Sequence, residues 1–295
     1  MVAPTIKGLT IETESPPTVR PLPEKPLVVI EPRKAWGSIN LGDLWAYRDL
    51  FYFLIWRDLK VRYKQTVLGV VWVVIQPLVA TLIFTIFLGV LARVPSDGTP
   101  YALLVYTGLL PWSFFSAALA SSSNSLVGNT HLITKVYFPR MIIPGAAIGA
   151  RLLDFGIALI ILAPLMFYYG VVPTKNLLAL PLLIALITMF SWGVGMWSSA
   201  LNVKYRDVGV ILPVFTQLWM FVSPVAYPAS LVPEKWRWLY YLNPMAGIVE
   251  GFRTAILGGS FKWVPLAYAI AATVIIFVYS AYAFRRMERS FADII

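Results

Sequence analysis

Cysteine is absent from this 295-residue chain, and histidine occurs only once, as His131. Without cysteine the chain has no disulfides, no thiolate metal sites and no cysteine nucleophile, and one histidine nearly excludes histidine-based triads. The sequence also lacks a Gly-x-x-x-x-Gly-Lys-Ser/Thr loop, and no polar segment is large enough to hold a nucleotide-binding domain. If ATP drives this protein, a separate subunit must hydrolyse it.

Charged residues are scarce as well, at 13% of the chain, whereas 59% of the residues are hydrophobic. A typical soluble domain is about one quarter charged, so this composition indicates a membrane protein. The net charge is +10, but lysine and arginine lie beside apolar runs and do not form a basic domain. This distribution favours contact with anionic lipid and excludes nucleic acid as a partner.

Six stretches have the roughly 20 apolar residues that a helix needs to cross about 30 Å of hydrocarbon. They are residues 68–91, 101–126, 141–169, 177–201, 208–227 and 263–284. The sequence therefore predicts an all-α membrane protein whose transmembrane domain covers residues 68–284. An even number of spans places both termini on the same side of the membrane.

Lysine and arginine near the ends of the spans predict which side that is, because cytoplasmic loops carry the excess. One side holds Arg57, Lys60, Arg62, Lys64, Lys135, Arg140, Lys204, Arg206, Arg285, Arg286 and Arg289; the other holds Arg93, Lys175, Lys235, Arg237, Arg253 and Lys262. We therefore expect both termini in the cytoplasm, with residues 285–295 as a cytoplasmic tail.

The segments outside the spans differ in character. Residues 1–40 are rich in proline and glutamate and lack the apolar core of a signal peptide, which predicts a disordered tail. Residues 41–67 mix aromatic and basic side chains, which is typical of an amphipathic helix at the membrane interface, here over Leu44–Lys64. Between spans five and six, proline and glycine interrupt residues 231–261, which indicates two short re-entrant helices at a pathway mouth.

Two groups of charged side chains stand out, and each has two interpretations. The basic residues Arg57, Lys60, Arg62 and Lys64 either satisfy the positive-inside rule or bind a lipid pyrophosphate. Inside the third span, Arg151 and Asp154 are three residues apart and can form an ion pair, which is either structural or part of the pathway. Charge within the spans is otherwise so scarce that ion-coupled transport is disfavoured.

The loop after the second span is either an ordinary basic loop or a docking segment for a soluble partner. Its candidate docking residues are His131, Lys135, Tyr137, Phe138 and Arg140, and we expect both aromatic side chains to be exposed.

Aromatic residues make up 15% of the chain, and many fall near the outer ends of the spans. They either form an interfacial belt or line a path on which sugar rings slide. The candidates are Tyr106, Trp112, Phe114, Phe115, Trp236, Trp238, Tyr240 and Tyr241.

Four ordered motifs carry a family resemblance that covers the chain from about Leu41 to the C-terminus. They are Tyr63–Pro77, Gly108–Phe115, Asn202–Asp207 and Leu242–Arg253. Together they resemble the polysaccharide-exporting permeases of the ABC type-2 superfamily, although Ser113 stands at a position that we expect to vary.

This resemblance implies a half-transporter in the bacterial inner membrane that pairs with a second copy of itself and two copies of a cytoplasmic ABC ATPase. ATP and Mg would bind to that ATPase, and this chain would hold no cofactor, no metal and no catalytic residue. The substrate would be a polysaccharide on undecaprenyl pyrophosphate, with O-antigen for lipopolysaccharide favoured over capsule or teichoic acid. The interface helix and the 131–140 loop would contact the ATPase, residues 231–257 would form an outer gate, and the aromatic residues would line a channel.

The alternative is a membrane-embedded transferase acting on polyprenyl-linked sugars, which would need a general base and paired carboxylates. The candidates are Asp207, Glu234 and Glu250, with Glu250 three residues before Arg253. Each is better interpreted as half of an ion pair at a helix end.

Overall fold

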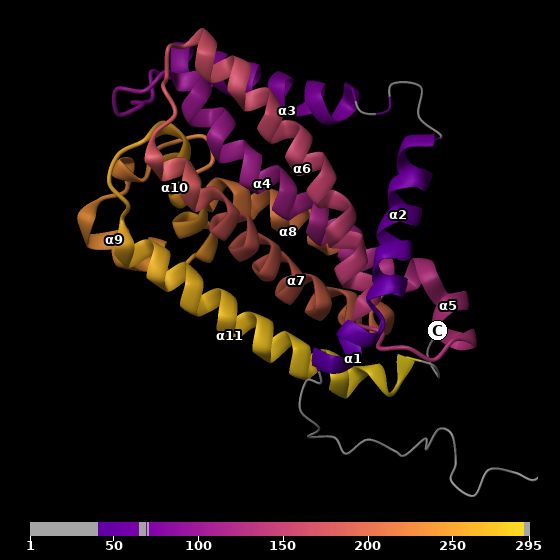
Figure 1. Ribbon diagram of the computed structural model, residues 1–295. Coiled ribbons are helices and arrows are strands. Elements are labelled where there is room, and N and C mark those ends of the chain that lie inside the picture. The colour runs from indigo at the N-terminus through magenta and orange to yellow at the C-terminus, as the bar shows by residue number, and fades with distance from the viewer. Residues whose placement is uncertain (1–40, 65–68, 70, 292–295) are drawn as a thin grey trace, which may run out of the picture. The chain divides into compact units, whose positions relative to one another are not determined.

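The computed structural model describes residues 41–64, 69 and 71–291 of the chain. The predicted tail at residues 1–40 and part of the Tyr63–Pro77 motif lie outside the described residues. The described residues form helices joined by short segments and contain no strand, as the all-α prediction requires (Figure 1).

The helices follow one another with few long connections. In chain order they are α1 (Leu41–Ala46), α2 (Arg48–Lys64), α3 (Val71–Phe84) with a π-helical continuation (Thr85–Leu91), α4 (Tyr101–Ser125), α5 (Thr130–Lys135), α6 (Ile142–Tyr168), α7 (Leu180–Lys204), α8 (Val208–Val222), α9 (Glu234–Tyr241), α10 (Pro244–Leu257) and α11 (Trp263–Glu288). Short 3₁₀ helices lie at Val127–Asn129, Lys175–Ala179 and Ala229–Leu231.

Five helical stretches among the described residues are long and apolar enough to span a membrane. They are Val71–Leu91, Tyr101–Ser125, Ile142–Tyr168, Lys175–Lys204 and Trp263–Glu288. The remaining predicted span, 208–227, contains the 15-residue helix α8, which is about 22 Å long and shorter than the hydrocarbon layer. It ends because Ser223 precedes Pro224 and is extended, with ψ of 150°. The sixth crossing therefore stays a prediction.

Helix α4 lies at the centre of the described helices and contacts α3, α6, α7, α8 and α10. The ring of Phe115 is fully buried, stacked on Phe190 at 5.2 Å and edge-on to Trp219 at 5.2 Å. Helices α7 and α11 pack closely because Gly193 lies against the backbone of Phe277, where a Cβ would be 3.0 Å away. The core is thus built from aromatic rings around α4 and a small residue at the α7–α11 contact.

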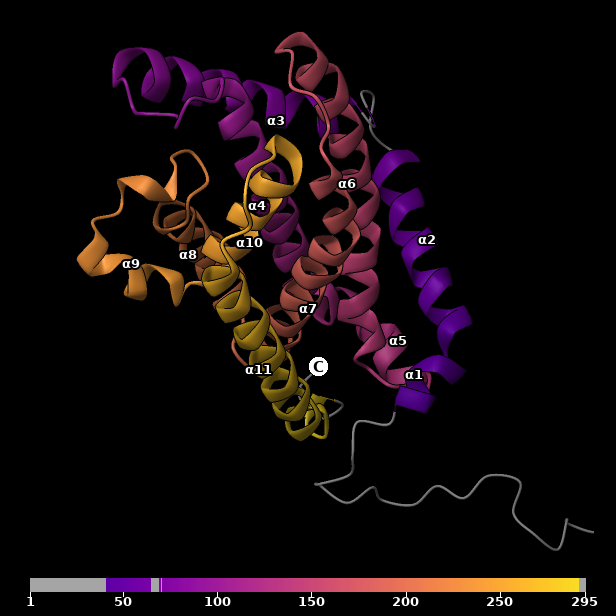
Figure 2. The ribbon, with the colours of Figure 1, turned by 60° about the vertical axis from the view of Figure 1, so that its left-hand side comes forward.

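The predicted interface helix is divided into α1 and α2. Helix α2 runs beside α6 in both side views (Figures 1 and 2). Leu54 is buried, Ile55 contacts Gly149, and Phe51 stacks on Trp192 of α7 at 6.4 Å. Helix α2 is therefore packed on the helical core along one side, and its other side exposes aromatic rings such as Trp56.

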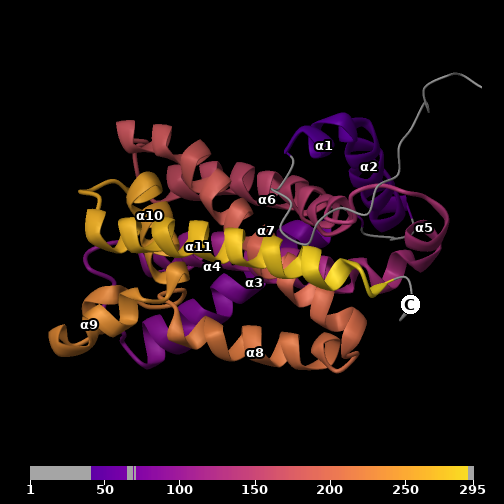
Figure 3. The same cartoon turned by 90° about the horizontal axis from the view of Figure 1, so that it is seen from below.

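The segment 231–261 contains two short helices, as predicted, but they differ in burial. Most of α10 is buried, whereas α9 has no buried residue. Asn243 separates them and caps α10, since its side chain accepts a hydrogen bond from the Met245 N–H at 3.1 Å. Seen from below, α9 and α2 lie on opposite sides of the helices between them (Figure 3).

Candidate functional site

One face of α4 is not covered by the other described helices. Ser113, Ala120 and Asn124 are exposed and Ser116 is half-buried. These positions recur every three or four residues, so they share one side of the helix. The central helix therefore leaves open a strip of small side chains, most of which carry a hydroxyl or amide group.

Helix α8 borders this strip and completes a groove of about 260 Å³. The groove is lined by Trp112, Ser116 and Ala120 of α4 and by Pro213, Thr216, Gln217 and Met220 of α8. Exposed polar groups on membrane helices normally face a bundle interior or a water-filled cavity. The groove thus suits a hydrated ligand rich in hydroxyl groups better than it suits lipid.

The predictions from the sequence do not include Ser116, Ala120, Asn124 or Gln217. Their signal is weak but present, because Ser113, Ser116, Ala120 and Asn124 are small or polar residues at helical spacing inside an otherwise apolar stretch. Ser113, treated there as a variable position, lies on the same face.

The Asn202–Asp207 motif holds α8 against the open face of α4. Asn202 Nδ2 donates to the Ser123 carbonyl at 3.0 Å and to Asn124 Oδ1 at 3.2 Å. Its Oδ1 accepts a hydrogen bond from the Gly209 N–H at 3.1 Å. One buried amide therefore joins the end of α7, the start of α8 and α4.

Arg253, the last residue of the fourth motif, fastens the opposite end of α8. Its Nη2 donates to the Val225 carbonyl at 2.7 Å and to the Leu104 carbonyl at 3.2 Å, and its Nη1 donates to the Tyr227 carbonyl at 3.0 Å. The guanidinium is buried, and these carbonyls accept its hydrogen bonds in place of water. Gly108, from the second motif, permits this contact because a Cβ there would lie 2.2 Å from the Val225 oxygen.

Asn243 joins the same region from the start of α10. Its Oδ1 accepts a hydrogen bond from Trp219 Nε1 at 2.9 Å, and its Nδ2 donates to Ser223 Oγ at 2.9 Å. Residues from three of the four motifs thus determine where α8 lies, and hence the shape of the groove.

The predicted aromatic residues fall into two groups. Those of α4 are buried, and only Trp112 lines the groove. The Tyr106 hydroxyl donates a hydrogen bond to the Ala158 carbonyl at 2.8 Å. On α9, Trp236 and Trp238 are exposed, and neither lines the groove. Their role in a channel stays a prediction.

Of the carboxylates considered for catalysis, Glu234 forms an ion pair as predicted, and Glu250 pairs with a different partner. Glu250 Oε1 pairs with Lys262 Nζ at 3.3 Å, whereas the predicted partner, Arg253, binds backbone carbonyls. Glu234 pairs with Arg237 at 3.4 Å, and Asp207 is exposed. The pairing of Glu250 with Arg253 was therefore wrong, because the buried carbonyls compete for the guanidinium.

The predicted docking segment exposes only one of its two aromatic rings. The Tyr137 side chain is 78% exposed, whereas Phe138 is 4% exposed and packs into a cluster with Leu126 and Phe284. Arg140 Nη1 donates to the Glu288 carbonyl at the end of α11 at 2.7 Å. The expectation that Phe138 is exposed was wrong, since this ring anchors the segment to its own chain. His131 and Lys135 are exposed on α5.

The basic residues of α2 differ in their surroundings. Arg57 pairs with Asp58 at 2.8 Å, Lys60 lies over the Trp56 ring at 5.5 Å, and Lys64 is exposed.

The ion pair between Arg151 and Asp154 is present, at 3.3 Å, and it has a third charged member. Arg62 of α2 contacts the same carboxylate oxygen at 2.8 Å. A residue predicted to bind lipid pyrophosphate thus lies within the cluster predicted inside the third span.

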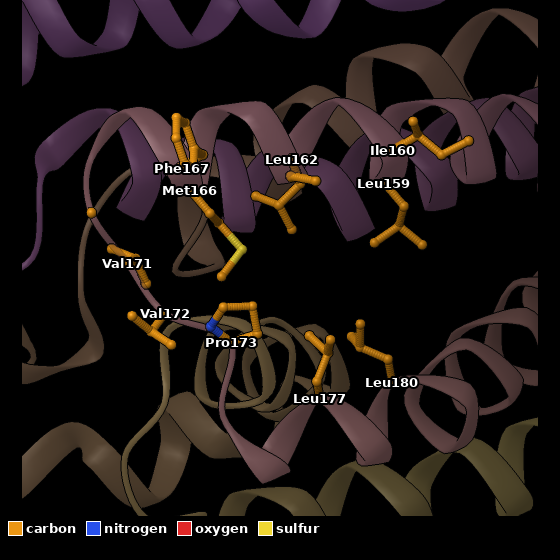
Figure 4. A pocket seen from close by; sticks show the side chains of 12 residues that line it. Leu159, Ile160, Leu162, Met166, Phe167, Val171, Val172, Pro173, Leu177 and Leu180 are labelled. Carbon is orange, nitrogen blue, oxygen red and sulfur yellow. The ribbon is translucent and has the colours of Figure 1, made fainter.

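A second groove, of about 700 Å³, lies between the end of α6 and the start of α7 (Figure 4). Met166 and Leu162 point across it toward Pro173 and Leu177. None of the twelve residues that line it has a charged or polar side chain. It offers only apolar contact and therefore fits hydrocarbon chains.

Comparison with known proteins identifies the family. The model of the ABC-2 type transporter family matches residues 49–257. The O-antigen export system permease protein RfbA of Klebsiella pneumoniae is 28% identical over 257 residues, which cover 87% of this chain and 97% of the relative. RfbA of Myxococcus xanthus is 27% identical over 85% of this chain and 97% of the relative.

The polysialic acid transport protein KpsM of Escherichia coli is 22% identical over 80% of this chain and 93% of the relative. The family match spans well over half of the chain and includes the groove, Asn202 and Arg253. This multi-pass membrane protein therefore belongs to the ABC-2 type transporter family.

Proposed function

We propose that this chain is the transmembrane subunit of an ABC exporter that moves an undecaprenyl-pyrophosphate-linked polysaccharide across the bacterial inner membrane. O-antigen is the substrate class favoured, because relatives named for O-antigen export align over 97% of their length. A separate ATPase subunit supplies the energy. The assembly contains two copies of each subunit, and both termini of this chain lie in the cytoplasm.

The groove between α4 and α8 is the observation that carries this proposal. Hydroxyl and amide groups of Ser116, Thr216 and Gln217 match the hydroxyl groups of a sugar chain, and the Trp112 ring offers apolar contact to carbohydrate C–H groups. A second copy facing this groove would close it into a path. Small side chains along the path leave room for a polymer to slide.

The cytoplasmic end would receive the substrate and the ATPase. The basic residues of α2, among them Lys60 and Lys64, would attract the pyrophosphate, since arginine and lysine both bind phosphate. Tyr137 projects from the anchored 131–140 segment with 78% of its side chain exposed, so it is available for docking. Helix α8 and the segment after it would provide the sixth crossing. Reporter fusions at both termini would test whether both lie in the cytoplasm.

Two variants test the path directly in cells that export the polymer. Ser116→Trp fills the groove, whereas Leu182→Trp adds the same side chain to α7 at a position that is 70% exposed. Export should be lost in Ser116→Trp and retained in Leu182→Trp, with equal amounts of both proteins in the membrane. Normal export by Ser116→Trp would contradict the assignment of the path.

The partner is tested by purifying the tagged chain from its native membrane in mild detergent. An ATPase subunit should copurify in equal amount, and the complex should hydrolyse ATP. A chain that copurifies with no ATPase would overturn the exporter assignment and favour a membrane-embedded transferase.

A further inference from the structure

A cluster of polar side chains joins α2 to α6 and α4. Arg62 Nη1 and Arg151 Nη1 both donate to Asp154 Oδ2, at 2.8 Å and 3.3 Å. The Tyr63 hydroxyl donates to the other oxygen, Oδ1. Arg151 Nε also donates to Ser121 Oγ at 2.8 Å. Asp154 lies 12 residues after Ile142, about 18 Å along α6.

The carboxylate of Asp154 occupies a position that would suit a phosphoryl group. Guanidinium groups bind carboxylate and phosphate oxygens through the same planar fork of N–H donors. The cluster is also open on one side, because the side chains of Arg62 and Arg151 are 25% and 27% exposed. Another anion can therefore approach Arg62 from outside.

Arg62 can leave Asp154 without isolating a charge. Asp154 still pairs with Arg151, which lies one turn before it on the same helix, and the penalty for a buried unpaired carboxylate is avoided. Tyr63 remains able to donate, because burial and the bond to Asp154 raise the pKa of Tyr63 to about 12. Arg62 is thus the member of the cluster that can exchange Asp154 for another anion.

We propose that the bond between Arg62 and Asp154 is a latch, which the pyrophosphate group of a polyprenyl lipid opens by replacing Asp154 at the Arg62 guanidinium. This inference rests on the proposed function and adds a molecular step to it. While the latch is closed, Asp154 competes with the lipid and lowers its apparent affinity. When it opens, the end of α2 that leads into α3 is released from α6, so binding of the substrate is coupled to movement of a helix.

Equilibrium binding of undecaprenyl pyrophosphate to the complete complex in lipid nanodiscs tests the latch. Asp154→Asn removes the competing charge and should tighten binding about tenfold, whereas Arg62→Gln should weaken it about tenfold, the scale of one charge-assisted hydrogen bond. Tyr63→Phe removes a support of the latch without changing charge and should tighten binding about twofold. Arg237→Gln, which breaks an ion pair on α9, is the matched control and should leave affinity unchanged.

The opposite signs separate a latch from an ion pair that only stabilises the fold. Loss of a purely structural pair would weaken binding, or leave it unchanged, in both Asp154→Asn and Arg62→Gln. Tyr63→Phe keeps the test decisive if Asp154→Asn fails to fold, which elution as a single species would reveal.

The movement of α2 has its own measurement, because the chain contains no cysteine. Spin labels on introduced cysteines at Val61 and Ile160, which are both exposed, report the distance between α2 and α6. Undecaprenyl pyrophosphate should shift this distance in the wild type, and Asp154→Asn should show the shifted distance without lipid. An identical distance in all three states would overturn the latch.

Failure of the latch and failure of the proposed function give different results. If the wild type does not bind undecaprenyl pyrophosphate, the proposed substrate is wrong. If it binds, but neither Asp154→Asn nor Tyr63→Phe binds more tightly, only the latch is wrong. Inorganic pyrophosphate and phosphatidylglycerol should bind at least tenfold more weakly, and equal binding of either would overturn recognition of the polyprenyl lipid.

Discussion

Replacing Gly108 by alanine should destabilise the protein, because α4 passes too close to the segment after α8 to admit a methyl group. A Cβ at this position would lie 2.2 Å from the Val225 oxygen and 2.8 Å from Arg253 Nη2. The Val225 carbonyl accepts the 2.7 Å bond from Arg253, so it cannot move aside without weakening that bond. The substitution therefore combines overpacking with the loss of a hydrogen bond to a buried cation.

The two effects can be given a size. Overpacking costs about 1–3 kcal/mol and a weakened hydrogen bond to a charged group costs about 1–2 kcal/mol, so a loss of about 3 kcal/mol is expected. For a chain of this size, that lowers the melting midpoint by about 6–12 °C.

Gly156→Ala is the matched control. It lies in α6, and a Cβ there would have no neighbouring atom within 4 Å. Alanine is favoured over glycine in a helix by about 0.5–1 kcal/mol, so its midpoint should be unchanged or higher. Heating in detergent followed by size-exclusion chromatography measures both variants. An unchanged midpoint for Gly108→Ala, or an equal loss for Gly156→Ala, would refute the argument from close contact.

Three further outcomes are expected. Phe138→Ala should lower the melting midpoint, since burial of this ring is worth about 3–5 kcal/mol, whereas Tyr137→Ala should keep the midpoint and lose export coupled to ATP hydrolysis. Asn202→Ala should cost about 1–3 kcal/mol and speed proteolysis between α7 and α8, because it leaves the Gly209 N–H without its acceptor. Burial and then Asp154 raise the pKa of Tyr63 from 10.0 to about 12. The stability that the protonated hydroxyl contributes is therefore complete below pH 10 and is lost as the pH rises toward 12. The melting midpoint of Tyr63→Phe should lack this loss at alkaline pH.

The helices could be predicted from the sequence because apolar runs and their breaks are local. The end of α8 shows the limit of that signal. The apolar run continues through Val225 to Tyr227 and predicts a span that ends at residue 227. The helix ends at Val222 instead, because Pro224 forces Ser223 into an extended conformation. The carbonyls that follow are bound by Arg253, which lies 28 residues from Val225 in the sequence.

Some partners of the charged residues could be predicted from local spacing, and others depend on contacts between distant segments. Arg151 and Asp154 are one helical turn apart, so their pairing follows from spacing alone. Glu250 and Arg253 have the same spacing and do not pair, because the carbonyls of Leu104 and Val225 hold the guanidinium. Arg62 lies 92 residues from Asp154, and only the packing of α2 on α6 brings them together.

The aromatic residues of α4 illustrate why the candidate path was only partly predictable. The sequence shows which residues carry an aromatic ring that can contact sugar. Whether sugar can reach a ring depends on the direction in which its side chain points. Phe114 and Phe115 point into the core, while their neighbour Ser116 faces the groove. The open face was identified by which residues the other helices leave uncovered, and a single sequence does not contain that information.

The open face of α4 leaves polar groups of a single copy of this chain without partners in a membrane. Among the described residues, Ser116 and Gln217 have no hydrogen-bond partner, although both line the groove. Hydrocarbon offers no partner either, and each polar group left unpaired there costs several kcal/mol. The exposed side chains of α8 beside the groove, such as Val214, Leu218 and Phe221, carry no such penalty because they are apolar. In the proposed exporter, this apolar flank would seal the groove from lipid against a second copy of the chain, and the space enclosed between them would hold water and the sugar chain.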